Sequence, residues 1–104
     1  MDREEAIALL RANEAELKAA GIERLSIFGS VARGDATRDS DVDVVIRLSP
    51  EAAQGGFAYF GRLDTLIRCL EEILGRPVDL VTEPMRKDRL RQSIEREAAV
   101  VFPS

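Results

Sequence analysis

Two acidic residues lead directly into the most β-branched segment of the chain, Asp41-Val42-Asp43-Val44-Val45-Ile46. A short apolar run of this kind predicts a strand buried on both faces, whose acidic end emerges from the core. Residues two apart in a strand point to the same side, about 7 Å from each other, so we expect Asp41 and Asp43 to project together. Any fold of this chain must therefore bury a strand that begins with two mutually repelling carboxylates.

Strand-like and helix-like patterns alternate along the rest of the sequence. Apolar runs predict further strands at 25–28, 78–82 and 99–102, and apolar spacings of three and four predict helices at 2–20, at 62–74 and from Pro84 onward. A helical turn is expected at 31–34, and 47–61 is expected to be a loop with a frayed helix start. This alternation predicts an α/β (α+β) fold in which a small mixed sheet is covered by helices.

Length and cysteine content suggest one domain without crosslinks. The 104 residues suit a single domain over 1–104. No apolar run approaches the roughly 20 residues needed to span a bilayer, and the acidic start is unlike a signal peptide. Cys69 is the only cysteine, which excludes an internal disulfide and favours the cytoplasm.

Charge and composition limit the catalytic sites and binding partners that this chain can have. The chain has no histidine, which excludes Ser-His triads and His-containing zinc sites. Its net charge of −4 disfavours bulk binding to DNA. Catalysis would have to use carboxylates, hydroxyls, cationic side chains or a hard metal ion.

Carboxylates on two predicted strands favour such a metal ion. Asp41 and Asp43 repel each other, and Mg²⁺ relieves that repulsion while binding phosphate oxygens. The alternative, a solvated strand end, is commoner for this short motif alone. Asp79 interrupts an apolar strand; it either joins the other two acids or faces water beside Arg76.

Gly29 and Ser30 follow the strand expected at 25–28. A glycine at this point lets backbone N–H groups approach an anion, and a serine hydroxyl adds a donor to a phosphate oxygen. The alternative is an ordinary turn with Ser30 as helix N-cap. The segment lacks the Gly-Lys-Ser/Thr ending of a Walker A loop.

Taken together, the segments FGSVARGD at 28–35 and SDVDVV at 40–45 closely resemble the signature of the polymerase-β-like nucleotidyltransferases. More narrowly, they resemble the minimal nucleotidyltransferases, in which G-S-x-A-R-G precedes S-D-x-D and a third aspartate lies on a later strand. Asp79, in VDLV at 78–81, matches that third position. The combined string is far more specific than any of its parts.

The resemblance implies a role for each matching residue. Gly29 and Ser30 would hold the β- and γ-phosphates of ATP, with Arg33 as a further contact to the triphosphate or, alternatively, an ion pair with Asp35. Asp41, Asp43 and Asp79 would bind two Mg²⁺ ions, and Asp79 would help to deprotonate the acceptor.

The resemblance also implies a partner. Larger relatives carry a second domain for the acceptor, for which this chain has no residues. Minimal members commonly pair with a HEPN-domain toxin and transfer AMP from ATP to its tyrosines, acting as the antitoxin of a type VII toxin–antitoxin pair in a hetero-oligomer. Two alternatives stay open: an antitoxin that neutralises by binding alone, and a transferase for a small molecule such as an aminoglycoside.

Four other features have plainer interpretations. Arg38 is expected to be solvent-exposed, and the basic run at 86–91 to be a solvated helix face, or else a contact for ATP or an acidic partner. Tyr59 and Cys69 are expected to pack in or near the core.

Overall fold

The computed structural model describes residues 2–34, 40–54, 57–83 and 98–102, together with Gln92 and Arg96. Its elements in chain order are α1 (Arg3–Ala12), α2 (Glu14–Ala19), β1 (Ile22–Phe28), α3 (Gly29–Arg33), β2 (Val42–Leu48), α4 (Phe57–Leu74), β3 (Val78–Thr82) and β4 (Ala99–Phe102). The predicted α+β class and all four predicted strands are confirmed.

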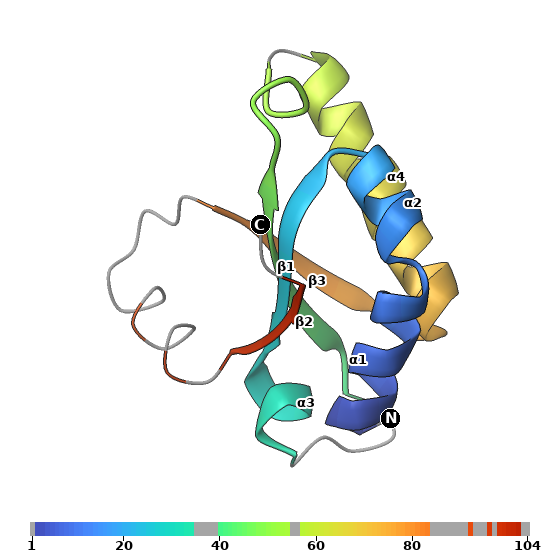
Figure 1. The fold of residues 1–104 in the computed structure, drawn as a ribbon, viewed down its shortest axis with the longest axis vertical. Coiled ribbons are helices and arrows are strands. Elements are labelled where there is room, and N and C mark those ends of the chain that lie inside the picture. Colours follow the sequence, from blue (N-terminus) through green and yellow to red (C-terminus); the bar gives the residue numbers. More distant parts are fainter. Residues whose placement is uncertain are drawn as a thin grey trace.

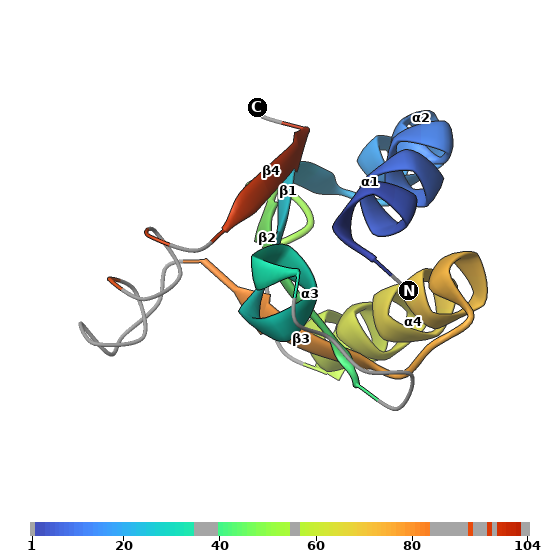
Figure 2. The same ribbon diagram turned by 90° about the horizontal axis from the view of Figure 1, so that it is seen from below.

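The four strands form one mixed sheet in the order β3-β2-β1-β4. β1 is antiparallel to β2 and to β4, whereas β2 and β3 are parallel. A parallel pair needs a crossover, and α4 supplies it between β2 and β3. α1, α2 and α4 all lie on one face of the sheet (Figures 1 and 2), so this face holds the core.

The core is built from the apolar face of each helix against alternate residues of the strands. The predicted face of the first helical segment is confirmed, because Leu10 and Leu17 are fully buried and Ile7 packs against the core. The other main contributors, all at most 4% exposed, are Leu25, Ile27, Val42, Val44, Ile46, Leu66, Leu70 and Leu74. Cys69 is partly buried against this cluster, as predicted.

The helix predicted over 2–20 is wrong in one respect, because it is two helices that meet at Asn13. The Asn13 backbone leaves the helical region (φ −111°, ψ 16°), and its side-chain amide donates to the Leu9 carbonyl at 2.9 Å. Asparagine competes in this way for backbone groups that a helix would use. At the N-terminus, Asp2 caps α1 by accepting a 2.8 Å hydrogen bond from the Glu5 N–H.

The loop predicted over 47–61 is wrong at its beginning, whereas the helix start expected within this segment is confirmed. β2 continues through Arg47 to Leu48, and α4 begins at Phe57. Leu48 is buried and Arg47 is not, so the period-two alternation of a strand extends past the all-apolar run. The helix was predicted to begin only at residue 62, because the preceding Gly61 is a weak helix former. Tyr59 therefore lies on a helix, with its hydroxyl 3.4 Å from Thr82 Oγ1.

Some predicted features lie outside the described residues: the helix expected from Pro84, the basic run at 86–91, and Arg38. Among the described helices, none is both long enough and apolar enough to cross a membrane.

Candidate active site

Strand pairing brings the predicted site residues to one end of the sheet. β1 ends at Phe28, which is the register partner of Asp43 on β2, and Asp43 is the register partner of Asp79 on β3. The Val42 N–H donates to the Pro77 carbonyl at 2.9 Å, which fixes the start of β2 beside β3. Directly after Phe28 the chain turns into α3, at this same end (Figure 2).

Gly29 and Asp43 are in close contact. Gly29 adopts a left-handed backbone conformation with φ +71°, which other residues rarely adopt. A Cβ atom built on Gly29 would overlap Asp43 Oδ2 and lie 3.0 Å from Asp43 Cγ. Position 29 therefore requires glycine for two independent reasons, and the carboxylate of Asp43 lies against the backbone that opens α3.

Burial and three neighbouring charged residues change the pKa of Asp43. Burial raises the pKa of the Asp43 carboxyl, and the negative charges of Asp79 and Asp41 raise it further, whereas Arg33 lowers it. Asp43 is half-buried, while Asp41, Asp79 and Arg33 are exposed. Among the described residues that affect this pKa, the negative charges of Asp41 and Asp79 oppose the single positive charge of Arg33, and a divalent cation would neutralise the carboxylates.

The donor set suits a hard metal ion that takes only part of its ligands from the protein. Among the described residues, no three acidic or thiol side chains already lie in a geometry that could hold one ion together. Mg²⁺ is usually held by one or two carboxylates plus phosphate oxygens and water. Exposed Asp41 and Asp79 beside half-buried Asp43 match that partial shell.

α3 supplies the residues predicted to contact a nucleotide. Ser30 is half-buried in its first turn, and Arg33 is exposed at its end. Gly34, with φ +82°, closes the helix by donating its N–H to the Val31 carbonyl at 3.2 Å. The helical turn predicted at 31–34 thus starts two residues earlier, and Gly29, Ser30 and Arg33 all lie on it.

The position of Asp79 agrees in part with the alternative prediction that it faces water. It is exposed, and β3 is an edge strand of the described sheet. No ion pair joins it to Arg76 within the part of the chain that the structure describes. Its negative charge nevertheless raises the pKa of Asp43, and the two residues are register partners on adjacent strands.

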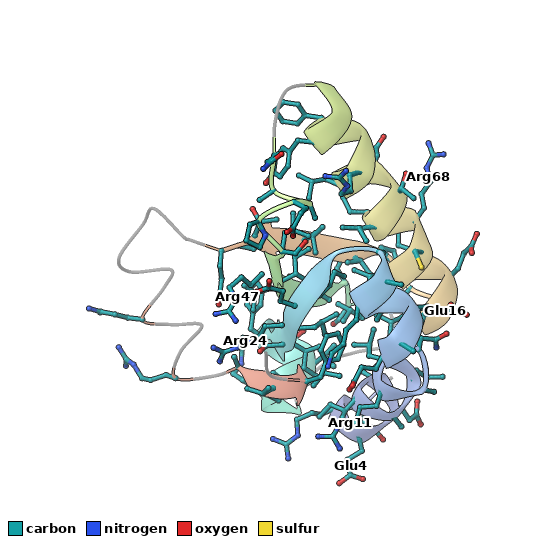
Figure 3. All side chains as sticks on the ribbon, turned by 45° about the horizontal axis from the view of Figure 1, so that its top comes forward. Glu4, Arg11, Glu16, Arg24, Arg47 and Arg68 are labelled. Carbon is teal, nitrogen blue, oxygen red and sulfur yellow. The ribbon has the colours of Figure 1, made fainter. Side chains whose placement is uncertain are left out.

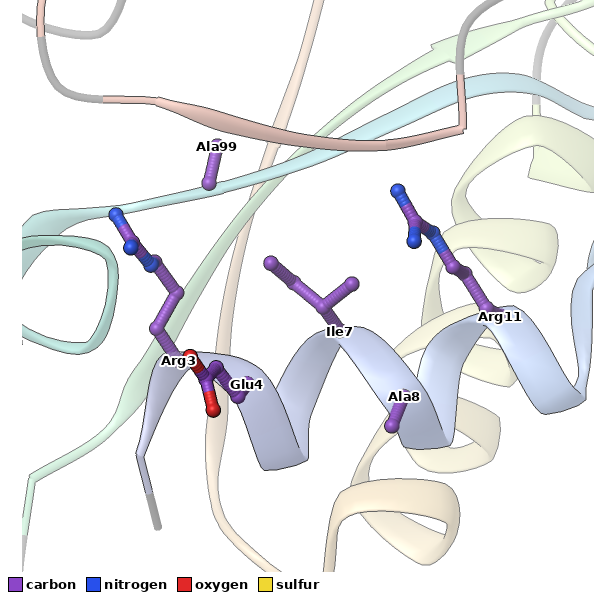
Figure 4. Close-up of a pocket in the computed structure, with 6 residues that line it drawn as sticks. All are labelled: Arg3, Glu4, Ile7, Ala8, Arg11 and Ala99. Atoms are coloured by element: carbon purple, nitrogen blue, oxygen red, sulfur yellow. The ribbon is translucent and has the colours of Figure 1, made fainter.

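A separate pocket of about 390 Å³ lies between α1 and β4 (Figure 4). Its lining residues are Arg3, Glu4, Ile7, Ala8, Arg11 and Ala99, none of which is a predicted site residue. Two arginines outside the predicted site, Arg24 and Arg47, are register partners and lie next to each other on the sheet (Figure 3). They stand in separate strands with no motif around them, so only the pairing reveals them.

Comparison with known proteins places the chain in a family. Residues 9–101 match the model of the nucleotidyltransferase domain family. The chain is 32% identical over 99 residues to the protein adenylyltransferase MntA of Thermococcus cleftensis, covering 94% of each chain. It matches the structure of a minimal nucleotidyltransferase with a TM-score of 0.75 and 34% identity over 95% of both chains.

A more distant fold neighbour comes from a complex. The chain superposes with a TM-score of 0.55 and 16% identity on a structure of a tri-AMPylated HEPN toxin of Shewanella oneidensis with its MNT antitoxin, covering 89% of this chain and 71% of that one. At this identity the match concerns the fold alone.

Proposed function

Because the chain belongs to the nucleotidyltransferase domain family, we propose that it transfers AMP from ATP to a hydroxyl group of a partner protein. Family membership makes it a nucleotidyl-transferring enzyme and confirms the resemblance carried by the segments at 28–35 and 40–45. The observation that carries the proposal is the contact of Gly29 with Asp43, which joins the predicted phosphate turn to the predicted metal ligands.

In the proposed reaction, the acceptor hydroxyl oxygen attacks the α-phosphorus of ATP. A new P–O bond forms to the acceptor while the bond to the leaving pyrophosphate breaks, and the hydroxyl proton passes to a carboxylate, for which we propose Asp79. Gly29, Ser30 and Arg33 hold the β- and γ-phosphates and so align the leaving group. Asp41, Asp43 and Asp79 hold Mg²⁺, two ions in our proposal, which when bound neutralise charge that develops at phosphorus.

The choice of acceptor rests on the relatives. A relative that covers 94% of the chain is named a protein adenylyltransferase, and a fold neighbour was solved with an AMPylated HEPN toxin. We propose that the acceptor here is a tyrosine of a HEPN-domain toxin, and that residues 1–104 act as one minimal antitoxin domain in complex with it. The match over 95% of a minimal nucleotidyltransferase supports this domain assignment.

A labelling experiment tests the proposal. The chain is incubated with MgCl₂ and the protein encoded by the neighbouring gene, with ATP labelled either at the α- or at the γ-phosphate. We expect label on the partner from α-labelled ATP only, because AMP rather than phosphate is transferred. Asp43→Asn should lose the transfer, whereas Asp64→Asn, which changes an exposed acid of α4, should retain it.

The same experiment separates the two alternatives. If Asp43→Asn binds the partner and still neutralises its toxicity without labelling it, the chain is an antitoxin that acts by binding. If pyrophosphate is released only with a small hydroxylated compound, the acceptor is that compound. Absence of label from wild-type protein under all conditions would overturn the transfer reaction.

A further inference from the structure

A single peptide group at the start of β3 is hydrogen-bonded on both of its sides. Its carbonyl oxygen, on Pro77, accepts the Val42 N–H of β2 at 2.9 Å. Its N–H, on Val78, donates to Glu71 Oε2 at 3.1 Å. Glu71 lies in the last turn of α4, just before the chain enters β3 (Figure 1). Because the C=O and N–H of a trans peptide point in opposite directions, the Glu71 carboxylate lies on the side of β3 away from β2.

This peptide group lies directly beside the candidate active site. Val42 precedes Asp43 on β2, and Val78 precedes Asp79 on β3. The two hydrogen bonds therefore hold the register in which Asp43 is the partner of Asp79. β3 is an edge strand of the described sheet, so on its outer side the Glu71 carboxylate satisfies an N–H that a further strand would otherwise accept.

Local helix energetics do not account for a glutamate at position 71. The last turn of α4 holds Glu71 and Glu72 and no basic residue, and a negative charge at a helix C-terminus is unfavourable. Within the described part of the chain, no ion pair involves the Glu71 side chain. Its contact with Val78 offsets this cost, because a hydrogen bond to an ionised carboxylate is roughly twice as strong as a neutral one.

We propose that Glu71 is a positioning residue for AMP transfer: by holding the peptide group between Pro77 and Val78, it keeps Asp79 beside Asp43. This inference rests on the proposed function, in which Asp79 holds Mg²⁺ and receives the acceptor proton. Hydrogen-bond partners outside a metal site commonly orient its ligands. A displacement of a reacting group by about 1 Å costs up to roughly 100-fold in rate.

Two substitutions of similar shape separate this hydrogen bond from the other properties of Glu71. Glutamine keeps an oxygen that accepts from the Val78 N–H, whereas methionine has similar length but only a weak acceptor. Both remove the negative charge, and both favour a helix about as well as glutamate. A difference between Glu71→Gln and Glu71→Met therefore reports the hydrogen bond itself. Glu72→Met makes the same change on the exposed neighbouring glutamate and serves as control.

The first measurement is the rate of AMP transfer from α-labelled ATP to the protein encoded by the neighbouring gene. Glu71→Met should lower kcat about tenfold or more and leave KM for ATP within about twofold, because α3 rather than β3 holds the β- and γ-phosphates in the proposed site. Glu71→Gln should keep kcat within about threefold of wild type, and Glu72→Met should match wild type.

The second measurement needs no catalysis. Mn²⁺, which is paramagnetic and takes the same oxygen ligands as Mg²⁺, broadens the NMR signals of nearby backbone amides. In wild type and Glu71→Gln, we expect substoichiometric Mn²⁺ to broaden the amide signals of Asp43 and Asp79 together. In Glu71→Met, the Asp79 signal should lose less intensity while Asp43 is broadened as before. The Val78 amide should exchange with solvent faster in Glu71→Met than in Glu71→Gln.

The outcomes separate this inference from the proposed function. Equal kcat in Glu71→Met and Glu71→Gln overturns the positioning role, as does equal broadening of Asp79 in the two variants or broadening of neither aspartate in wild type. Failure of Glu71→Met alone to fold overturns it too, because the bond would then maintain the fold. If wild type transfers no AMP to any acceptor, but only Glu71→Met loses the broadening of Asp79, the positioning role stands and the proposed function fails.

Discussion

Gly29 and Asp43 lie so close that a single methyl group on Gly29 would overlap a carboxylate oxygen of Asp43. Gly29 ends the turn from β1 into α3, and Asp43 lies near the start of β2. The contact therefore links the two halves of the sequence signature, which are separated along the chain by residues 36–39. A substitution that disrupts this contact therefore tests directly whether the candidate site is the active site.

Gly29→Ala should displace Asp43 and reduce AMP transfer by at least about 100-fold. It should also destabilise the fold by about 1 kcal/mol, because alanine is strained at positive φ. Gly75→Ala is the matched control: Gly75 has nearly the same φ, +67°, but nothing lies within 4 Å of an added Cβ. We expect a similar loss of stability in urea unfolding with full transfer activity. Equal activity loss in both variants would show that backbone strain, not contact with Asp43, is responsible.

The pH dependence of stability should reveal the raised pKa of Asp43 in metal-free protein. Its folded-state pKa lies above the ordinary 3.8, so the folded state holds this proton more tightly than the unfolded state. The protonated carboxyl therefore contributes most stability below the unfolded pKa, and that contribution is lost as the pH rises through the folded pKa. Asp43→Asn should become more stable relative to wild type as the pH rises from about 4.

The measurement is thermal unfolding of both proteins in EDTA across this pH range. Asp64→Asn serves as control for replacing an exposed carboxylate on α4, on the helical side of the sheet. A relative stability of Asp43→Asn that stays constant, or falls, as the pH rises would contradict the prediction.

Mg²⁺ should stabilise the folded protein through the same carboxylates. At a concentration tenfold above its Kd, a ligand that binds only the folded state adds about 1.4 kcal/mol, which corresponds to an increase of at least about 4 °C in unfolding temperature for a domain of this size. The effect should disappear in Asp43→Asn and shrink at acidic pH. NaCl at equal ionic strength controls for screening, and an equal shift in wild type and Asp43→Asn would exclude the site.

Two adjacent leucines of α1 test how the helices are anchored to the sheet. Leu10 is fully buried, whereas Leu9 is 39% exposed. Leu10→Ala should destabilise the protein by about 3 kcal/mol through lost burial and the cavity left behind. Leu9→Ala removes the same atoms and should change the free energy of unfolding by less than about 1 kcal/mol. Comparable losses in urea unfolding would contradict the orientation of α1.

Much of the fold follows from local patterns that are visible in the sequence. The β3 bounds at 78–82 and the β4 bounds at 99–102 are as predicted, because each segment is apolar and lies between turn signals or polar residues. The errors occurred where a side chain or a neighbour changes the local outcome. Asn13 splits the first helix through its own hydrogen bond, and Leu48 extends β2 because it is buried against the core.

The sequence by itself determined the residue types of the candidate site: a glycine and serine after a strand, two aspartates two residues apart, and a third on a later strand. It also determined the family, because that combined string is specific. Only the tertiary structure decided which of these residues meet. Pairing across β1, β2 and β3 sets Phe28, Asp43 and Asp79 in line, and brings Arg24 opposite Arg47. These contacts join residues far apart in the chain, so no local pattern encodes them; they depend on strand order and register, which burial of the core selects.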